Sequence, residues 1–235
     1  MATPSPIQLF GSQPAWGNPD LSPFVAKLET WLRMAGLPYE KKRGNPPGAP
    51  KGKIPYVIVD GVKLGDSQKI IEELTQRHQV QLDAHLTPQQ KATALAVRRM
   101  VEEGLYFVLM RARWIEPDGW VEQQKAFGGM VPAMIRPFLL PFIRGKVREK
   151  LDGQGTGRHS RDEALAIGVA DLQALETILG DQPFLLGEQP TSVDATVYAF
   201  LSGAQKHPVD SPLRQAASTP RLLAYVERMQ AKYWN

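Results

Sequence analysis

The chain has 235 residues, no cysteine, four histidines and a formal net charge of +4. Without cysteine it can form neither a disulfide nor a protein thiolate, which excludes stapled secreted scaffolds, cysteine-based catalysis and zinc–thiolate sites. The composition, 43% hydrophobic and 22% charged, is typical of a soluble globular protein. The sequence has no basic run with interleaved aromatic residues, so we expect no nucleic-acid partner.

The first 80 residues alternate between predicted strands and helices. Ser22-Pro23 predicts the start of one helix, because serine is a common N-cap and proline is common at the first helical position. Asp66-Ser67 predicts the start of a second. Short runs that end at turn-forming residues are typical of strands. The predicted strands are 7–10, 39–43, 54–59 and 62–64. The order predicts a compact α/β domain over residues 1–80.

No strand is predicted after the polar linker 79–87, so residues 88–235 are expected to form an all-helical domain. The basic and then glycine-rich segment 146–159 predicts a mobile connection. The helical patterns are 88–114, 120–143 in pieces cut by prolines, 161–179, 191–201 and 220–233, with a break at 116–119.

Residues 127–143 are apolar but contain Arg136 and three prolines. A spanning helix needs about 20 uninterrupted apolar residues, so we interpret the segment as buried or interfacial. Met1 to Pro6 do not resemble a signal peptide, and a cytoplasmic location is expected. The basic stretch 144–150 is interpreted first as a solvated connection and second as a contact for a membrane surface or a partner.

Three segments of the first domain have features that suit an anion. Pro55 opens a predicted strand, where a cis Ile54–Pro55 bond fits, and Lys53 precedes it. Ser22 and Asp66-Ser67 stand at helix starts, where free N–H groups and the helix dipole attract negative charge. Each also has a plainer interpretation, as a loop proline or a helix cap. Together they fit an extended, peptide-like ligand with carboxylates at both ends.

Thr191 and Asp194 have the spacing of a capping box at the start of a later helix. This pair is interpreted as a folding signal, and we give it no catalytic role.

The order of these features resembles the glutathione transferase superfamily, in which a thioredoxin-like domain precedes an all-helical domain. Lys53-Ile54-Pro55 resembles the strand-opening cis-proline segment of that family, Asp66-Ser67 its acidic-serine pair, and Thr191-x-x-Asp194 its capping motif. Longer stretches are similar to the failed-axon-connections and metaxin-like branch, namely 22–24, 27–30, 32–40, 157–160, 179–185 and 190–196.

This resemblance implies a homodimer that uses glutathione as co-substrate, without a metal, and transfers it to a small electrophile. Ser22 would stabilise the glutathione thiolate. Ser12, which lies closer to the end of the first predicted strand, is the rival for that role. The implied glutathione-binding residues are Lys53, Ile54, Pro55, Asp66 and Ser67.

The electrophile would lie against the first long helix, where Tyr106, Met110 and Trp114 are candidates. The alternative for these three is core packing, since apolar residues at helical spacing usually face a core. Arg111 and Arg113 would favour an anionic substrate or remain solvated.

The sequence departs from the thioredoxin pattern at one informative place. Ser22 and Val25 stand where those proteins carry Cys-x-x-Cys, so any sulfur chemistry must use a sulfur that arrives with the ligand. Two other functions stay open at this point: a binding or adaptor protein without turnover, as in the metaxin-like branch, and a glutathione-dependent isomerase.

Overall fold

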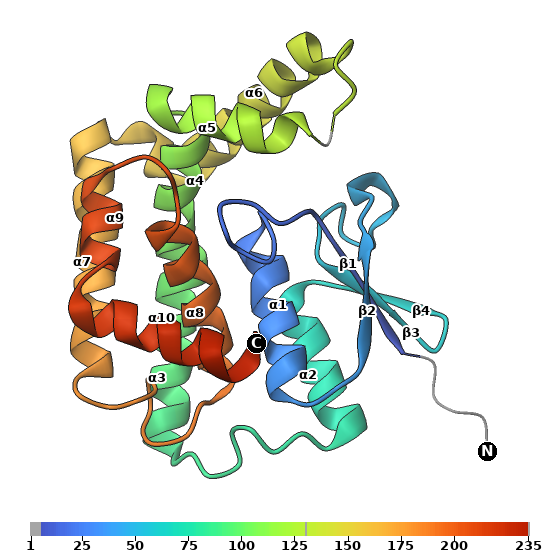
Figure 1. The fold of residues 1–235 in the computed structure, drawn as a ribbon, viewed down its shortest axis with the longest axis vertical. Helices are drawn as coiled ribbons and strands as arrows, with labels where there is room; N and C mark the ends of the chain where they lie inside the picture. The colour runs from blue at the N-terminus through green and yellow to red at the C-terminus, as the bar shows by residue number, and fades with distance from the viewer. Residues whose placement is uncertain (1–5, 130, 235) are drawn as a thin grey trace.

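The first third of the chain contains one mixed sheet (Figure 1). The computed structural model describes residues 6–129 and 131–234, so the prediction about the N-terminal end falls largely outside the described residues. The strand order is β2-β1-β3-β4, with β1 parallel to β2 and antiparallel to β3, and β3 antiparallel to β4. The strands are β1 (Ile7–Gly11), β2 (Tyr39–Arg43), β3 (Tyr56–Val59) and β4 (Val62–Gly65).

Two helices, α1 (Pro23–Met34) and α2 (Ser67–His78), pack on one face of this sheet and lie between it and the helical half (Figure 1). Burial alternates along β1, which places Leu9 against Leu28 of α1 and Ile70 of α2 in one apolar cluster. The predicted thioredoxin-like α/β unit is confirmed, and the Ile54–Pro55 bond before β3 is cis.

The rest of the described chain is helical, as predicted, and contains no named strand. No helix within the described ranges is long and apolar enough to cross a membrane. The long predicted pattern 88–114 is continuous but contains one π-helical stretch, η2. The elements are α3 (Pro88–Arg99), η2 (Met100–Leu105), α4 (Tyr106–Trp114), α5 (Pro117–Gly128), α6 (Arg136–Gln154), α7 (Arg161–Leu179), α8 (Ser192–Gln205), α9 (Pro212–Ala217) and α10 (Pro220–Tyr233), with 3-10 turns η1 (Pro46–Gly48) and η3 (Thr156–Arg158).

The segment 146–159 is not the mobile connection that the sequence suggested. Most of it belongs to α6, which continues through Pro141 to Gln154. The basic residues favour a helix, and the helix is anchored because Leu151 is buried and the Arg144 guanidinium donates hydrogen bonds of 2.8 Å to the Trp114 and Ile115 carbonyls. Only the chain after Gln154 leaves the helix.

The predicted break at 116–119 is also shorter than expected. Pro117 takes the first position of α5, so only Ile115 and Glu116 separate the two helices. Gly119 permits this tight turn: a Cβ atom there would lie 1.8 Å from the Ala112 carbonyl oxygen. The close contact fixes α5 against α4. The short helix α9 was not predicted.

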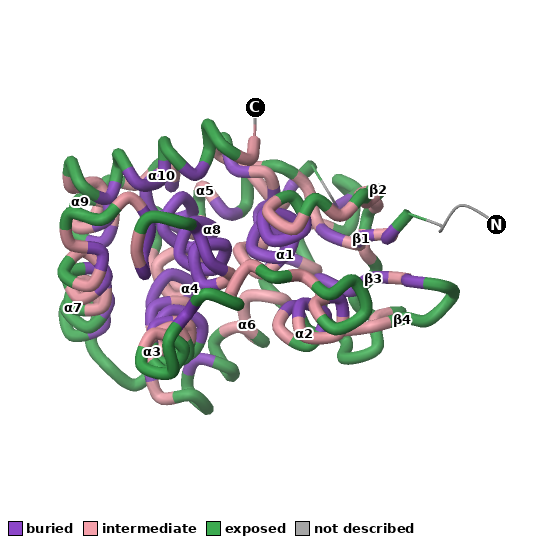
Figure 2. The backbone as a smooth tube through the Cα atoms, turned by 90° about the horizontal axis from the view of Figure 1, so that it is seen from below, coloured by how far each residue is buried: buried purple, intermediate pink, exposed green. Residues whose placement is uncertain are grey.

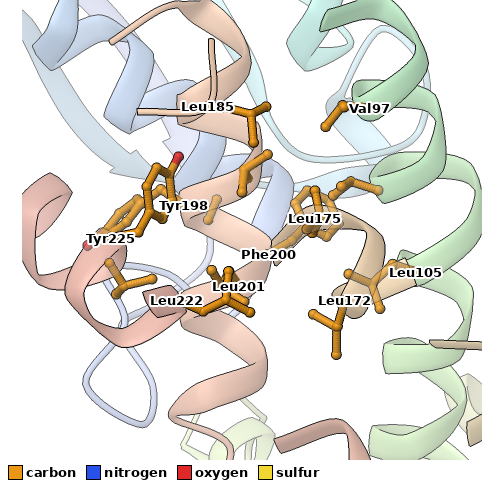
Figure 3. Close-up of a cluster of buried hydrophobic side chains, with 14 of the residues drawn as sticks. Val97, Leu105, Leu172, Leu175, Leu185, Tyr198, Phe200, Leu201, Leu222 and Tyr225 are labelled. Carbon is orange, nitrogen blue, oxygen red and sulfur yellow. The ribbon is translucent and has the colours of Figure 1, made fainter. Parts of the chain in front are cut away.

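Helix α8 forms the centre of the helical half. Figure 2 shows it buried along its length, and Figure 3 shows its Tyr198, Phe200 and Leu201 among side chains from neighbouring helices such as Leu172 and Tyr225. Helix α8 also packs on α1, where the Trp31 indole donates to the Ser192 hydroxyl at 3.1 Å. This seam joins the two halves.

The start of α8 confirms the predicted folding role of Thr191 and Asp194. The fully buried Asp194 carboxylate accepts from the Thr191 N–H at 2.7 Å, the Thr191 hydroxyl at 2.9 Å, the Leu185 N–H at 2.9 Å and the Tyr225 hydroxyl at 3.0 Å. Burial raises the pKa of Asp194, and these hydrogen bonds oppose the rise. One side chain therefore ties together a helix start, a loop and α10.

We expect Asp194→Ala to lower the free energy of unfolding by about 2–4 kcal/mol, because several buried donors lose their acceptor together. The matched control is Glu163→Ala in the capping box of α7, where Glu163 accepts from the Ser160 N–H at 2.7 Å but is 65% exposed. There water replaces the carboxylate, and we expect a much smaller loss. Urea unfolding measures both, and equal losses would contradict this account.

Candidate active site

Two adjoining cavities lie where the two halves meet. The larger is about 520 Å³ and is lined by all five residues that the resemblance assigned to glutathione: Lys53, Ile54, Pro55, Asp66 and Ser67. The smaller is about 170 Å³ and receives the three expected electrophile-pocket residues, Tyr106, Met110 and Trp114. The structure thus brings each predicted group together around one space.

The larger cavity combines a helix N-terminus with a group of cations. Asp66 caps α2, and its carboxylate accepts the N–H groups of Gln68 at 3.0 Å and Lys69 at 3.1 Å, while Ser67 behind it is 5% exposed. The backbone of Asp66 is left-handed, with a φ of 82°. Lys51, Lys53 and Lys150 line the same cavity. This arrangement suits a zwitterionic ligand with carboxylates that need positive partners.

Lys150 reaches this cavity from α6. The sequence had placed it in a solvated connection, and the structure corrects this. Burial lowers the pKa of the Lys150 ammonium, and the charge of Lys53 lowers it further. Two like charges therefore face the cavity together, and an anion between them would relieve their repulsion.

The smaller cavity has mostly apolar walls from α1, α4, α5 and α8. Tyr106 also packs edge-on against Phe24 and Phe200, with ring centroids 4.8 and 6.0 Å apart. The two arginines of α4 differ. Arg113 lines the cavity, whereas Arg111 lies 2.9 Å from Glu116 in an ion pair and donates to the Thr156 and His159 carbonyls. The remaining lining residues include Ser12, Leu21, Pro23, Leu109 and Gln123.

Ser22 is one of four residues that line both cavities, together with Ile54, Tyr106 and Phe127. It stands at the N-cap of α1, yet its hydroxyl makes no capping hydrogen bond to that helix. Ser12 lines only the smaller cavity. Ser22 and Tyr106 are thus the two hydroxyl-bearing residues among those that line both cavities, and Ser22 is the one at a helix N-terminus.

Asp20 holds the loop that carries both serines, and the sequence analysis missed it. Its carboxylate accepts the Ser12 N–H and the Ser22 N–H, each at 2.9 Å, and lies 3.2 Å from the Lys41 ammonium. Burial raises the pKa of Asp20 to about 6, and Lys41 is the main opposing influence. An aspartate in a Gly-, Pro- and Asn-rich loop looks like an ordinary turn residue, so no signal in the sequence marked it.

A buried ion pair beside the larger cavity was missed as well. The Lys27 ammonium of α1 lies 2.5 Å from the Glu102 carboxylate of η2 and donates to the Gln68 amide oxygen of α2 at 3.0 Å. Burial lowers the pKa of Lys27, while Glu102 raises it. The pair joins the two halves. Its partners are 75 residues apart in sequence, which pattern analysis does not detect.

Comparisons with known proteins agree with this geometry. Residues 23–119 match the glutathione S-transferase N-terminal domain, and residues 168–229 match the glutathione S-transferase C-terminal domain. Isoprene-epoxide–glutathione S-transferase from Rhodococcus sp. (strain AD45) is 37% identical, over 97% of this chain and 99% of its own. Failed axon connections from Drosophila melanogaster is 34% identical over 91% of this chain and 54% of its own, and mouse metaxin-1 is 28% identical over 84% and 65%.

Solved structures share the fold. Glutathione transferase Omega 3C from Trametes versicolor has a TM-score of 0.61 at 18% identity, over 97% of this chain and 86% of its own. A glutathione S-transferase from Pseudomonas fluorescens has a TM-score of 0.59 at 22% identity, over 97% and 96%. The chain belongs to the glutathione S-transferase family, and its relatives include the failed-axon-connections and metaxin branch that the sequence resembled.

We expect Asp20 to titrate near pH 6 when its carboxyl signal is followed by NMR. That pKa lies above the unfolded value of about 3.9, so the folded protein holds the proton more tightly. The contribution of Asp20 to the free energy of unfolding therefore falls as the pH rises from about 4 to about 6, and is constant above that range.

The matched pair of variants is Lys41→Met and Lys42→Met. Lys41→Met removes the cation 3.2 Å from Asp20, and the pKa should rise further. Lys42 follows on the same strand but pairs with Glu40 at 3.1 Å on the surface, so Lys42→Met should leave Asp20 unchanged. An Asp20 that titrates near pH 4 in the wild type would contradict the burial argument.

Proposed function

We propose that this chain transfers glutathione to a small electrophile, with Ser22 stabilising the thiolate. One observation carries the proposal: the Ser22 side chain borders both the large cavity of the thioredoxin-like half and the apolar cavity of the helical half. The family relationship supports glutathione as the co-substrate.

Glutathione is proposed to lie along the larger cavity. The γ-glutamyl end would meet Asp66 and Ser67 at the start of α2, and the main chain of Ile54 would pair with the peptide. Lys53 would meet the glycine carboxylate, with Lys150 beside it. In these positions each charged side chain of the cavity would face a group of opposite charge on glutathione.

The thiol of glutathione must lose its proton near neutral pH. A free thiol has a pKa of about 8.5, and a hydroxyl donor at a helix N-terminus lowers it by stabilising the charged form. Ser22 stands at the N-cap of α1, and its hydroxyl is not committed to that helix. The thiolate would then attack an electrophile in the smaller cavity.

The size of the smaller cavity supports a small electrophile. It measures about 170 Å³, and an apolar cavity of roughly 150 Å³ holds a molecule the size of benzene. The relative from Rhodococcus carries isoprene epoxide in its name. Small epoxides are therefore the first class of electrophile to test. The homodimer and cytoplasmic location stay predictions.

We expect Ser22→Ala to lower kcat/KM about 10² to 10³-fold, the usual cost of removing one donor that stabilises developing charge. The pKa of enzyme-bound glutathione, followed by the ultraviolet absorbance of its thiolate, should rise in the same variant. Ser12→Ala is the matched control, because it removes a hydroxyl from the smaller cavity alone, and we expect a loss below about tenfold. A larger loss for Ser12→Ala would transfer the role to that residue.

A second function, glutathione binding without turnover, is favoured by the similarity to failed axon connections and metaxin-1. Immobilised glutathione and a panel of epoxides and halides distinguish the two. The proposal predicts retention together with turnover. Retention without turnover would favour the binding protein, and failure to bind glutathione at millimolar concentration would overturn both.

A further inference from the structure

Arg113 is a cation without a counter-ion in the wall of the smaller cavity. One guanidinium nitrogen donates to the Gly203 carbonyl at 2.9 Å, another lies 3.4 Å from the Leu21 carbonyl, and the group lies over the Trp16 ring, 5.3 Å from its centroid. Within the described chain no aspartate or glutamate forms an ion pair with it, in contrast to Arg111. A guanidinium has five N–H donors, so it keeps donors for a ligand.

Gln123 lines the same cavity from α5 and is also incompletely paired. Its side chain is 2% exposed, and its Oε1 atom has no hydrogen-bond partner in the described part of the chain. Buried polar atoms are almost always paired. An acceptor left open at a cavity wall therefore points to a ligand that donates to it.

Both groups are held by rigid elements. Arg113 is fixed against α8, where a Cβ atom at position 203 would lie 3.0 Å from its guanidinium. Gln123 lies about one helical turn after Gly119, the residue that allows α5 to approach α4 closely. A cavity of about 170 Å³ brings its walls within reach of one small molecule. The apolar pocket thus contains a donor held by its own side-chain contacts, Arg113, and an unpaired acceptor on a closely packed helix, Gln123.

We propose that Arg113 and Gln123 form an oxygen-binding subsite that makes epoxides the preferred electrophiles of this enzyme. The inference rests on the proposed glutathione transfer. The epoxide oxygen accepts from Arg113, which lowers the barrier to opening the ring. The hydroxyl formed after opening donates to the Gln123 oxygen.

The step balances without a further reagent. The thiol proton leaves to water when glutathione binds. The thiolate sulfur forms a bond to one epoxide carbon while that carbon's bond to oxygen breaks, and the electron pair stays on the oxygen. The resulting alkoxide faces Arg113 and takes a proton from water. Burial lowers the pKa of Arg113 to about 10, so the guanidinium keeps its charge at neutral pH.

An electrophile with a permanent carboxylate is the rival ligand for Arg113. It would pair with the cation but offer the Gln123 oxygen no donor, either before or after the reaction. A neutral epoxide satisfies Arg113 before the reaction and both groups after it, which is why the two residues together favour it.

The test compares three four-carbon electrophiles, 1,2-epoxybutane, 1-bromobutane and 4-bromobutanoate, at saturating glutathione. We expect Arg113→Met to lower kcat/KM for the epoxide about 100-fold or more. Its effect on bromobutane should stay within about threefold, because a departing bromide is a weak hydrogen-bond acceptor. Glutathione affinity should be unchanged. Gln123→Leu should leave the epoxide kcat/KM nearly unchanged, because Gln123 accepts only from the hydroxyl formed after ring opening, and it should weaken inhibition by the hydroxylated product about tenfold.

Arg99→Met is the matched control, since Arg99 pairs with Glu103 on the surface of the same helical run, and it should change nothing. Melting temperatures check folding, and Arg113→Lys, with its point charge, should show an intermediate loss if Arg113→Met is unstable. The inference would be overturned if Arg113→Met lowered kcat/KM equally for the epoxide and the bromide, or lowered neither. It would also be overturned if the wild type preferred bromobutanoate and Arg113→Met abolished that preference. A wild type that turns over none of the three would instead overturn the proposed function, and the subsite with it.

Discussion

The ion pair between Lys27 and Glu102 is the interaction on which the site depends. Both side chains are buried, at 1% and 7% exposure, and a charge is stable there only when it is paired. Lys27 belongs to the helix that begins at Ser22, and Glu102 belongs to the π-helical stretch that leads into Tyr106. The pair therefore fixes the helix that Ser22 caps against the helix that lines the smaller cavity.

The two halves that meet at this contact contribute different parts of the site. The thioredoxin-like half supplies a helix N-terminus, a cis-proline strand and lysines, which suit a peptide with charged ends. The helical half supplies an apolar pocket lined by Arg113, which pairs with no carboxylate among the described residues. Where a thioredoxin pair of cysteines would stand, Val25 is fully buried and Ser22 faces the cavities. A chain without cysteine thus places a serine beside both cavities, at the position of the first thioredoxin cysteine.

Much of this was predictable, because it depends on local signals. Capping residues at Ser22, Asp66 and Thr191 marked helix starts, and turn-forming residues marked the ends of the short strands. The predicted site residues cluster because they stand at the ends of these elements. Strand and helix termini on the same edge of a small α/β unit meet in space.

The features that the sequence concealed depend on tertiary contacts. The second half of α6 was interpreted as a connection because it is basic and then glycine-rich, while the anchoring of the helix through Arg144 is visible only in the fold. Gly119 resembled a helix breaker, yet it allows a helix to approach its neighbour. Asp20 accepts hydrogen bonds from the serine loop, and the Gln123 oxygen has no partner among the described residues. Neither fact can be inferred from residue spacing in the sequence.

We infer that Ser22 stands where glutathione meets the electrophile. The decisive experiment is a crystal structure of the protein with bound glutathione. We expect the γ-glutamyl end at Asp66 and Ser67, and the sulfur within hydrogen-bond distance of the Ser22 hydroxyl at the junction of the two cavities. A sulfur that lies against Ser12 instead, or glutathione bound outside the larger cavity, would contradict it.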